Sequence, residues 1–204
     1  MTTEGQILDG SQFGTWIDKI ITDYKPNTIV EIGTWKGLGS TKRIIDSIIK
    51  NNYSPNFISL ESNLTFYRTA VNNLKNFSDK VDLVWGRLVE KEDVDLFVYN
   101  NPITEEMNRW LNSDIVDYLE CENVIHKIPN QIDFLLLDGG EFSTYSEWIK
   151  LKDRTNIVAL DDTAVLKCKQ IREELLNNHN YGLIVDSSDR NGFAIFKRNE
   201  YVSI

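Results

Sequence analysis

The chain contains 204 residues, of which 41% are hydrophobic and 26% charged, so it is large enough for one well-buried core and too small for two ordinary domains. Its 31 acidic residues outnumber the 22 basic ones, and the formal net charge of −9 leaves no basic stripe to neutralise nucleic acid or an anionic membrane. We therefore expect a single domain over residues 1–204 that acts on a small molecule, with no nucleic acid and no membrane as partner.

The termini and the cysteines bear on where the protein works. The N-terminal sequence MTTEGQILDG has no basic segment followed by an apolar run, and no stretch of about 18 apolar residues occurs in the chain. Neither the two cysteines, Cys121 and Cys168, nor the two histidines, His126 and His179, show a spacing typical of a metal or redox site. A cytoplasmic protein with reduced thiols is expected, and its oligomeric state stays open, with a homodimer as one option.

Strands and helices alternate along most of the chain. A helix is expected over residues 14–25, ended by Pro26. Short apolar, β-branched runs then predict buried strands at residues 27–33, 56–61, 81–86, 132–138 and 156–162. Segments with apolar residues three or four apart predict helices at residues 40–52, 64–77 and 163–179. Such an order predicts an α/β fold with a mostly parallel sheet covered on both faces.

Two segments depart from this alternation. Residues 181–198 read as two strands joined by an Asp/Ser/Asn/Gly turn, which predicts an antiparallel hairpin at one edge of a seven-stranded sheet. Residues 87–131 form an insertion of about 45 residues where a far shorter connection would suffice. Within it we expect a helix over residues 104–120 and a short strand over residues 95–102. Insertions of this kind usually cover the active-site edge or provide a partner surface.

Three glycines gather directly after the first predicted strand, in the stretch VEIGTWKGLGST. Gly33, Gly37 and Gly39 follow the spacing G-x-x-x-G-x-G, which differs from the G-x-G-x-x-G of nicotinamide-binding folds and from the phosphate-binding loop of NTPases. In an open parallel sheet, ligands bind beyond the carboxyl ends of the strands, where glycine lets the backbone approach them. A plain structural turn is the alternative. The second strand then ends in Glu61, where a carboxylate can accept hydrogen bonds from ribose hydroxyls.

The stretch EIGTWKGLGST resembles the first motif of class I S-adenosylmethionine-dependent methyltransferases, especially the small-molecule O-methyltransferases. The resemblance covers the order of elements from about residue 28 to residue 197, and it implies a Rossmann-like, doubly wound sheet that binds S-adenosylmethionine. It implies that Glu31 faces the methionine portion of the cofactor and that Gly86 lies near the adenine, although Arg87 and Leu88 depart from the family pattern. The full set of expected cofactor-binding residues is Glu31, Gly33, Thr34, Gly37, Glu61, Gly86 and Asp138.

Acidic residues follow the fourth and fifth predicted strands. Asp138, Asp161 and Asp162 should meet at one edge of the sheet with Glu141 close by, and so many carboxylates need a counter-charge. A divalent cation such as Mg²⁺ would supply it and could lower the pKa of a substrate hydroxyl. The pattern resembles metal-dependent O-methyltransferases, which implies that Asp138, Asp161 and Asp162 hold the metal. Helix capping by Asp138 or Asp162 is the structural alternative.

Together these signals predict an O-methyltransferase acting on a hydroxyl of a small molecule, such as a sugar or glycan precursor, with divalent-metal assistance. The expected catalytic residues are Asp138, Glu141 and Asp161, with Glu141 as the candidate base where the related sugar and antibiotic enzymes carry histidine. Two other functions stay open: a module that binds S-adenosylmethionine without transferring methyl groups, and another nucleotide-dependent enzyme on a related sheet.

Overall fold

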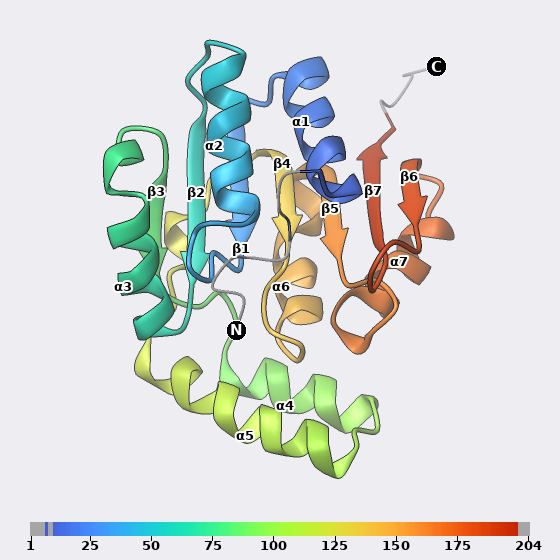
Figure 1. Ribbon diagram of the computed structural model, residues 1–204. Coiled ribbons are helices and arrows are strands. Elements are labelled where there is room, and N and C mark those ends of the chain that lie inside the picture. Colours follow the sequence, from blue (N-terminus) through green and yellow to red (C-terminus); the bar gives the residue numbers. More distant parts are fainter. Residues whose placement is uncertain (1–6, 8–9, 200–204) are drawn as a thin grey trace.

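A computed structural model describes residue 7 and residues 10–199 of the chain, which fold around one seven-stranded sheet with the order β3-β2-β1-β4-β5-β7-β6 (Figure 1). Strands β1 to β5 are parallel, and β7 pairs antiparallel with both β5 and β6. The predicted sheet and its C-terminal hairpin are therefore confirmed. The strands are β1 Thr28–Ile32, β2 Asn56–Glu61, β3 Asp82–Trp85, β4 Ile132–Leu137, β5 Thr155–Asp161, β6 Tyr181–Ser187 and β7 Phe193–Arg198.

Helices cover both faces of this sheet. The α-helices are α1 Gln12–Tyr24, α2 Ser40–Lys50, α3 Leu64–Asn73, α4 Lys91–Asn100, α5 Glu105–Glu120, α6 Thr144–Leu151 and α7 Leu166–Leu176. Short 3-10 turns lie at Lys75–Phe77, Ile125–Lys127 and Lys152–Arg154. Within residue 7 and residues 10–199, no helix is both long enough and apolar enough to cross a membrane.

The two faces of the central strands bury separate apolar clusters. Ile29 of β1 packs with isoleucines of α1 and α2, whereas its neighbour Val30 packs with Trp148 of α6 and Ile171 of α7. Successive side chains of a strand point to opposite faces, so a strand covered on both sides must be apolar throughout. This burial explains why the strand sequences read as continuous apolar runs rather than as an alternation of apolar and polar residues.

The insertion corrects one sequence-based expectation. The strand predicted over residues 95–102 is wrong, because residues Lys91–Asn100 form the helix α4. Glu90 and Asp93 form a capping box at its start, and Val94 and Phe97, three positions apart, are buried together. The run DLFVY is too short for its period to distinguish a strand from a helix, and the cap with the buried face decides for the helix. The helix predicted over residues 104–120 is confirmed as α5.

Helices α4 and α5 lie beyond the carboxyl ends of the parallel strands, as Figure 1 shows, and so cover that edge of the sheet. Arg87 holds them in place. Its backbone bridges to Asn123, and its guanidinium donates hydrogen bonds to the carbonyl oxygens of Tyr118 (3.1 Å) and Cys121 near the end of α5. The same group pairs with Glu90 at 2.8 Å. Arg87 therefore ties the exit of β3 to both insertion helices.

The loop after β1 meets the end of β4 at Gly33. This residue has a φ of +99°, and a Cβ atom there would lie 2.1 Å from the carbonyl oxygen of Asp138. The amide of Asp138 in turn donates to the carbonyl of Ile32 at 2.9 Å. Only glycine combines this left-handed backbone with such a close approach.

We predict that Gly33→Ala lowers the free energy of unfolding by roughly 2–4 kcal/mol, since it adds a backbone clash to the strain of a positive φ. Gly10→Ala is a matched control, because Gly10 also has a positive φ (+85°) but a Cβ atom there would meet no atom of the described residues within 4 Å. Urea denaturation of the three proteins measures the difference. Equal losses in the two variants would show that the contact with Asp138 is unimportant.

Candidate functional site

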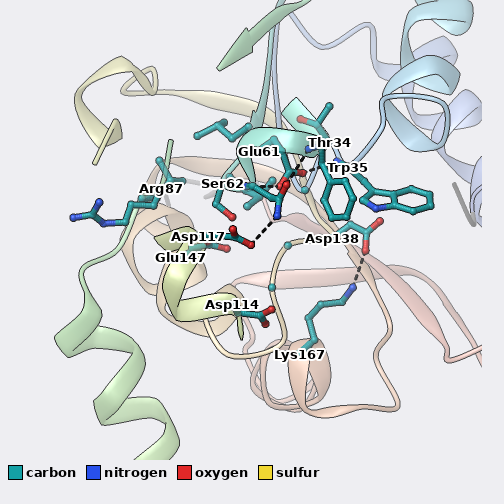
Figure 2. Close-up of a pocket in the computed structure, with 18 of the residues that line it drawn as sticks. Thr34, Trp35, Glu61, Ser62, Arg87, Asp114, Asp117, Asp138, Glu147 and Lys167 are labelled. Carbon is teal, nitrogen blue, oxygen red and sulfur yellow. Dashed lines mark hydrogen bonds and ion pairs between the residues drawn. The ribbon is translucent and has the colours of Figure 1, made fainter. Parts of the chain in front are cut away.

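A cavity of about 490 Å³ lies at the carboxyl ends of the strands, beneath the insertion. Its wall includes residues at or directly after the carboxyl ends of β1 through β5, namely Gly33, Glu61, Gly86, Asp138 and Asp161. Helix α5 contributes Asp114, Asp117 and Tyr118 to the wall. Figure 2 shows Asp114 and Asp117 among the lining residues. The cavity includes the point between β1 and β4 at which the strand order reverses, where open α/β sheets bind ligands.

The glycine loop forms one wall of this cavity. The amides of Gly33 and Thr34 both donate to the carbonyl of Leu60 at 3.0 Å, and the Thr34 and Ser59 hydroxyls share a hydrogen bond of 2.6 Å. These bonds fix the loop against β2. Gly39 also lines the cavity, whereas Gly37 does not: a Cβ there would meet the side chain of Leu74 at 2.7 Å. Gly37 thus serves close packing of the loop on α3 and its following turn.

Glu31 is placed differently from the expectation. Its side chain is completely buried behind the loop and is not part of the cavity wall. Its Oε2 accepts hydrogen bonds from Thr41 and Ser59, both at 2.6 Å. Burial raises the pKa of Glu31 to about 7 even though these hydroxyl groups favour the charged form. In this position Glu31 organises the loop from behind, and direct contact with a ligand remains a prediction.

Glu61 does face the cavity, at the end of β2. Its Oε2 accepts a hydrogen bond from the amide of Trp35 at 2.6 Å, and its Oε1 accepts one from the amide of Asn63 at 2.9 Å. Burial raises its pKa to about 7 against the effect of these two bonds. Each carboxylate oxygen keeps a second lone pair for a ligand hydroxyl. The rings of Trp35 and Phe66, whose centroids are 5.9 Å apart in an edge-to-face arrangement, also line the cavity as an apolar part of its wall.

Gly86, Arg87 and Leu88 all lie in the cavity wall, and contact of Gly86 with an adenine stays a prediction. A Cβ at Gly86 would lie 2.6 Å from a methyl group of Val124, so the glycine also makes room for the end of the insertion. The departure from the family pattern at Arg87 is explained by its bonds to the end of α5.

The acidic residues after β4 and β5 do meet. Oxygen atoms of Asp138, Asp161 and Asp162 lie within 4.8 Å of one another, close enough to share one metal ion. Their cationic partner could not be foreseen from the sequence. The ammonium of Lys167, from the first turn of α7, lies 2.7 Å from Asp138 Oδ1 and 2.7 Å from Asp162 Oδ2. Arg190 lies 3.6 Å from Asp161.

The charges in this cluster influence one another strongly. Burial would lower the pKa of Lys167, but Asp138 and Asp162 raise it above its usual range, so the side chain stays charged. Burial and the neighbouring aspartates raise the pKa of Asp161 to about 7. Burial opposes ionisation of Asp162 too, yet Lys167 holds its pKa below the ordinary value. Burial raises the pKa of Asp138 as well, against the effect of Lys167. Asp161, with a pKa of about 7, can exchange a proton near neutral pH.

Neither Asp138 nor Asp162 acts as a helix cap. Val165 precedes α7 and Ser143 precedes α6 at the capping positions, and Asp162 instead accepts from the side chain of Asn191 at 3.1 Å. Glu141, the predicted base, accepts a hydrogen bond from the amide of Lys167 at 3.2 Å and is not part of the cavity wall. Burial raises its pKa. Its position favours a structural role at the start of α7, while its role as a base is an untested prediction.

A second acidic group, absent from the sequence-based expectations, faces the first across the cavity. It contains Asp114, Asp117, Tyr118 and Glu147. The spacing of Asp114, Asp117 and Tyr118 at i, i+3 and i+4 on a predicted helix could have indicated their common face. Figure 2 shows Asp117 below the glycine loop, where its Oδ2 accepts a hydrogen bond from the side-chain amide of Asn63 at 2.8 Å. The Tyr118 hydroxyl donates to Glu147 Oε1 at 2.6 Å, and Glu147 Oε2 has no partner among the described residues.

The titration of Glu147 gives a pH test of this arrangement. Burial raises its pKa from 4.5 to about 7, so the folded protein holds the proton more tightly than the unfolded chain does. Its contribution to stability is complete below pH 4.5 and is lost as the pH rises through 7. Glu147→Gln should therefore be as stable as the wild type at pH 4.5 and more stable at pH 8, by about 1–3 kcal/mol.

Denaturation curves at several pH values measure this effect, and Glu173→Gln, at an exposed position of α7, is the control that should show no such dependence. A Glu147→Gln protein that loses stability at pH 8 would contradict the assignment of a neutral buried carboxyl.

No family model matches this sequence, and no curated protein is detectably similar to it. Solved structures are similar in fold. Methyltransferase PaMTH1 of Podospora anserina, bound to SAH, is 12% identical with a TM-score of 0.61, over 92% of this chain and 78% of that chain. An O-methyltransferase from Bacillus cereus in complex with SAH is 12% identical with a TM-score of 0.60, and the match covers 96% of this chain and 84% of that chain. TomG from Streptomyces achromogenes, an O-methyltransferase in complex with SAM, is 12% identical with a TM-score of 0.58, and the match covers 95% of this chain and 82% of that chain.

These likenesses extend over nearly the whole chain, although the sequences have diverged widely. They agree with the seven-stranded sheet and with β7 antiparallel between β5 and β6. The resemblance found in the sequence is thereby confirmed at the level of the fold. The chain has the fold of class I S-adenosylmethionine-dependent methyltransferases.

Proposed function

We propose that this protein is an S-adenosylmethionine-dependent O-methyltransferase that acts on a hydroxyl group of a small molecule, such as a sugar or glycan precursor. The observation that carries the proposal is that one cavity holds both sets of groups such a reaction needs. The glycine loop and Glu61 line one part of it, and Asp138, Asp161 and Asp162 line an adjoining part. Proteins of the same fold bind SAM or SAH, as their structures record.

In this proposal the cofactor lies along the glycine loop, with its ribose hydroxyls on Glu61 and its adenine against Trp35 and Phe66. Bound S-adenosylmethionine supplies the reactive methyl group on its sulfonium. The cavity residues would hold the acceptor oxygen in line with that methyl group, so that the transfer would convert the sulfonium to a neutral thioether. The acceptor proton passes to Asp161, whose raised pKa of about 7 suits a base at neutral pH.

The side of the cavity that α5 closes supports a polyhydroxylated substrate. Asp114, Asp117, Asn63 and Tyr118 present carboxylate, amide and phenol groups toward one space. Such groups discriminate by hydrogen bonding, because a buried polar group left without a partner costs free energy. Two buried free cysteines are in keeping with a reducing cytoplasmic location, which is the location we propose.

Divalent-metal assistance depends on whether an ion can reach the acidic cluster. In kind and spacing, the oxygens of Asp138, Asp161 and Asp162 fit a hard cation. Lys167, however, already lies between Asp138 and Asp162, so an ion could bind these carboxylates only after the ammonium has moved. No step of the mechanism above therefore passes through a metal.

The two alternative functions, a non-catalytic cofactor-binding module and another nucleotide-dependent enzyme, would require different residues in the cavity and in the glycine loop. A module that only binds the cofactor would not require a buried carboxylate of raised pKa in its cavity, whereas Asp161 lines the cavity and has a pKa raised to about 7, which supports a catalytic function. Another nucleotide-dependent enzyme would be expected to favour the G-x-G-x-x-G spacing, which the loop after β1 lacks.

We predict that Asp161→Asn reduces methyl transfer by a factor on the order of 10²–10⁴, because the amide cannot accept the acceptor proton. Affinity for S-adenosylhomocysteine should change by less than about threefold, since the glycine loop and Glu61 are untouched. Transfer of labelled methyl groups to a panel of sugars and phenols measures the first quantity, and isothermal titration measures the second.

Asp82→Asn, at an exposed position at the start of β3, is the matched control and should alter neither quantity. An equal loss of turnover and cofactor affinity in Asp161→Asn would contradict the assigned role. Cofactor binding without transfer to any acceptor, in the wild type as well, would instead favour the non-catalytic module.

A further inference from the structure

Lys167 has unusual surroundings for a lysine. Its side chain is only 7% exposed, and its ammonium touches carboxylates from two different strand ends, Asp138 after β4 and Asp162 after β5. Lysine is almost never buried to this extent unless it is paired. The side chain also lines the cavity, and Figure 2 shows it directed from α7 toward Asp138.

The balance of charge in the cluster explains the burial. Asp138, Asp161 and Asp162 would carry three negative charges if all were ionised, and Lys167 and Arg190 bring two positive charges to the same place. The raised pKa of Asp161 shows how the remaining charge is avoided near neutral pH. The counter-charge that the carboxylates require is thus already present in the chain itself.

An ammonium and a divalent ion cannot share this position. A magnesium ion binds carboxylate oxygens at about 2.0–2.1 Å and needs near-ideal octahedral geometry. In the same space Lys167 Nζ lies 2.7 Å from oxygens of two of the three carboxylates, so the ion and the ammonium would repel each other at contact distance. Binding an ion therefore means expelling Lys167 from a buried, doubly paired site.

We propose that Lys167 is the resident cation of the cluster formed by Asp138, Asp161 and Asp162, so that the wild-type protein needs no divalent ion there. An ammonium has three N–H bonds, and the described part of the chain provides carboxylate partners for two of them. The third can be donated to a ligand oxygen in the cavity. Lys167 would then place a fixed positive charge beside the acceptor oxygen of the proposed reaction.

Metal binding can be tested without an acceptor and independently of the proposed function. The probe is Mn²⁺, titrated into metal-free protein and followed by isothermal titration and by the electron paramagnetic resonance signal of the free ion. We expect no stoichiometric binding to the wild type at millimolar Mn²⁺. Lys167→Gln, which removes the charge but keeps much of the side-chain length, should bind one ion per chain at least about tenfold more tightly.

Three variants serve as controls. Lys169→Gln removes an exposed lysine from the same helix, and this variant, like the wild type, should show no stoichiometric binding of Mn²⁺. Lys167→Arg keeps the positive charge and should likewise not bind the ion. Adding Asp161→Asn to Lys167→Gln removes one ligand and should weaken the new site.

Thermal melting in Mn²⁺ and in EDTA shows whether each variant folds. Lys167→Gln should melt at a lower temperature in EDTA and recover in Mn²⁺, while the wild type should be unaffected by either.

The wild-type titration decides the matter even if Lys167→Gln fails to fold. One ion bound per wild-type chain at micromolar affinity, lost in Asp161→Asn, would overturn the proposal. A folded Lys167→Gln protein that does not bind Mn²⁺ would overturn it as well. If S-adenosylhomocysteine does not bind but the metal results are as expected, the proposed reaction fails and the assignment of Lys167 stands.

Discussion

The contact between Gly33 and the backbone of Asp138 is the constraint on which the candidate site depends. It joins the exits of β1 and β4, the two strands between which the order of the sheet reverses, with no room for a Cβ atom at Gly33. Because these exits touch, the glycine loop and the acidic cluster open into the same cavity. A wider separation would leave a cofactor and an acceptor in separate clefts, and the proximity on which methyl transfer relies would be lost.

The candidate site also depends on the burial of ionisable side chains around that cavity. Glu31, Glu61, Glu147 and Asp161 all have pKa values raised to about 7, chiefly by burial, and they come from different elements of the fold. Lys167 is the opposite case, a buried cation kept charged by two aspartates. Glu61, Glu147 and Asp161 line the cavity and Glu31 lies behind its glycine loop, and such a gathering of perturbed groups is typical of functional sites. The insertion contributes to this environment by closing the cavity with α5.

Much of the fold could be predicted from local patterns. The apolar runs identified the five parallel strands, since strands buried on both faces must be apolar throughout, and the turn residues between Ser187 and Phe193 identified the hairpin. The run at residues 95–102 could not be assigned in this way, because only the cap at Glu90 and the packing of Phe97 distinguish a helix from a strand there. The carboxylates at strand ends were predictable because parallel strands share one carboxyl edge.

Lys167 was not predictable from the same patterns. It stands in the first turn of a helix rich in charged residues, 29 positions after Asp138, and nothing in its neighbours distinguishes it from the exposed Lys169. Its role follows from the turn between β5 and α7, where Asp162 has a φ of +56° and directs the chain back over the cluster. The sequence therefore indicated that a counter-charge was needed and suggested a metal, while the tertiary structure brings a lysine to that place.

The proposed reaction requires that the cavity bind S-adenosylmethionine through the glycine loop and Glu61. Isothermal titration of S-adenosylhomocysteine into the wild-type protein in EDTA, with NAD as the competing ligand, tests it most directly. We expect one molecule of S-adenosylhomocysteine per chain, bound at micromolar affinity, no comparable binding of NAD, and a marked loss of affinity in Glu61→Gln. Failure of S-adenosylhomocysteine to bind, or preference for NAD, would contradict the claim.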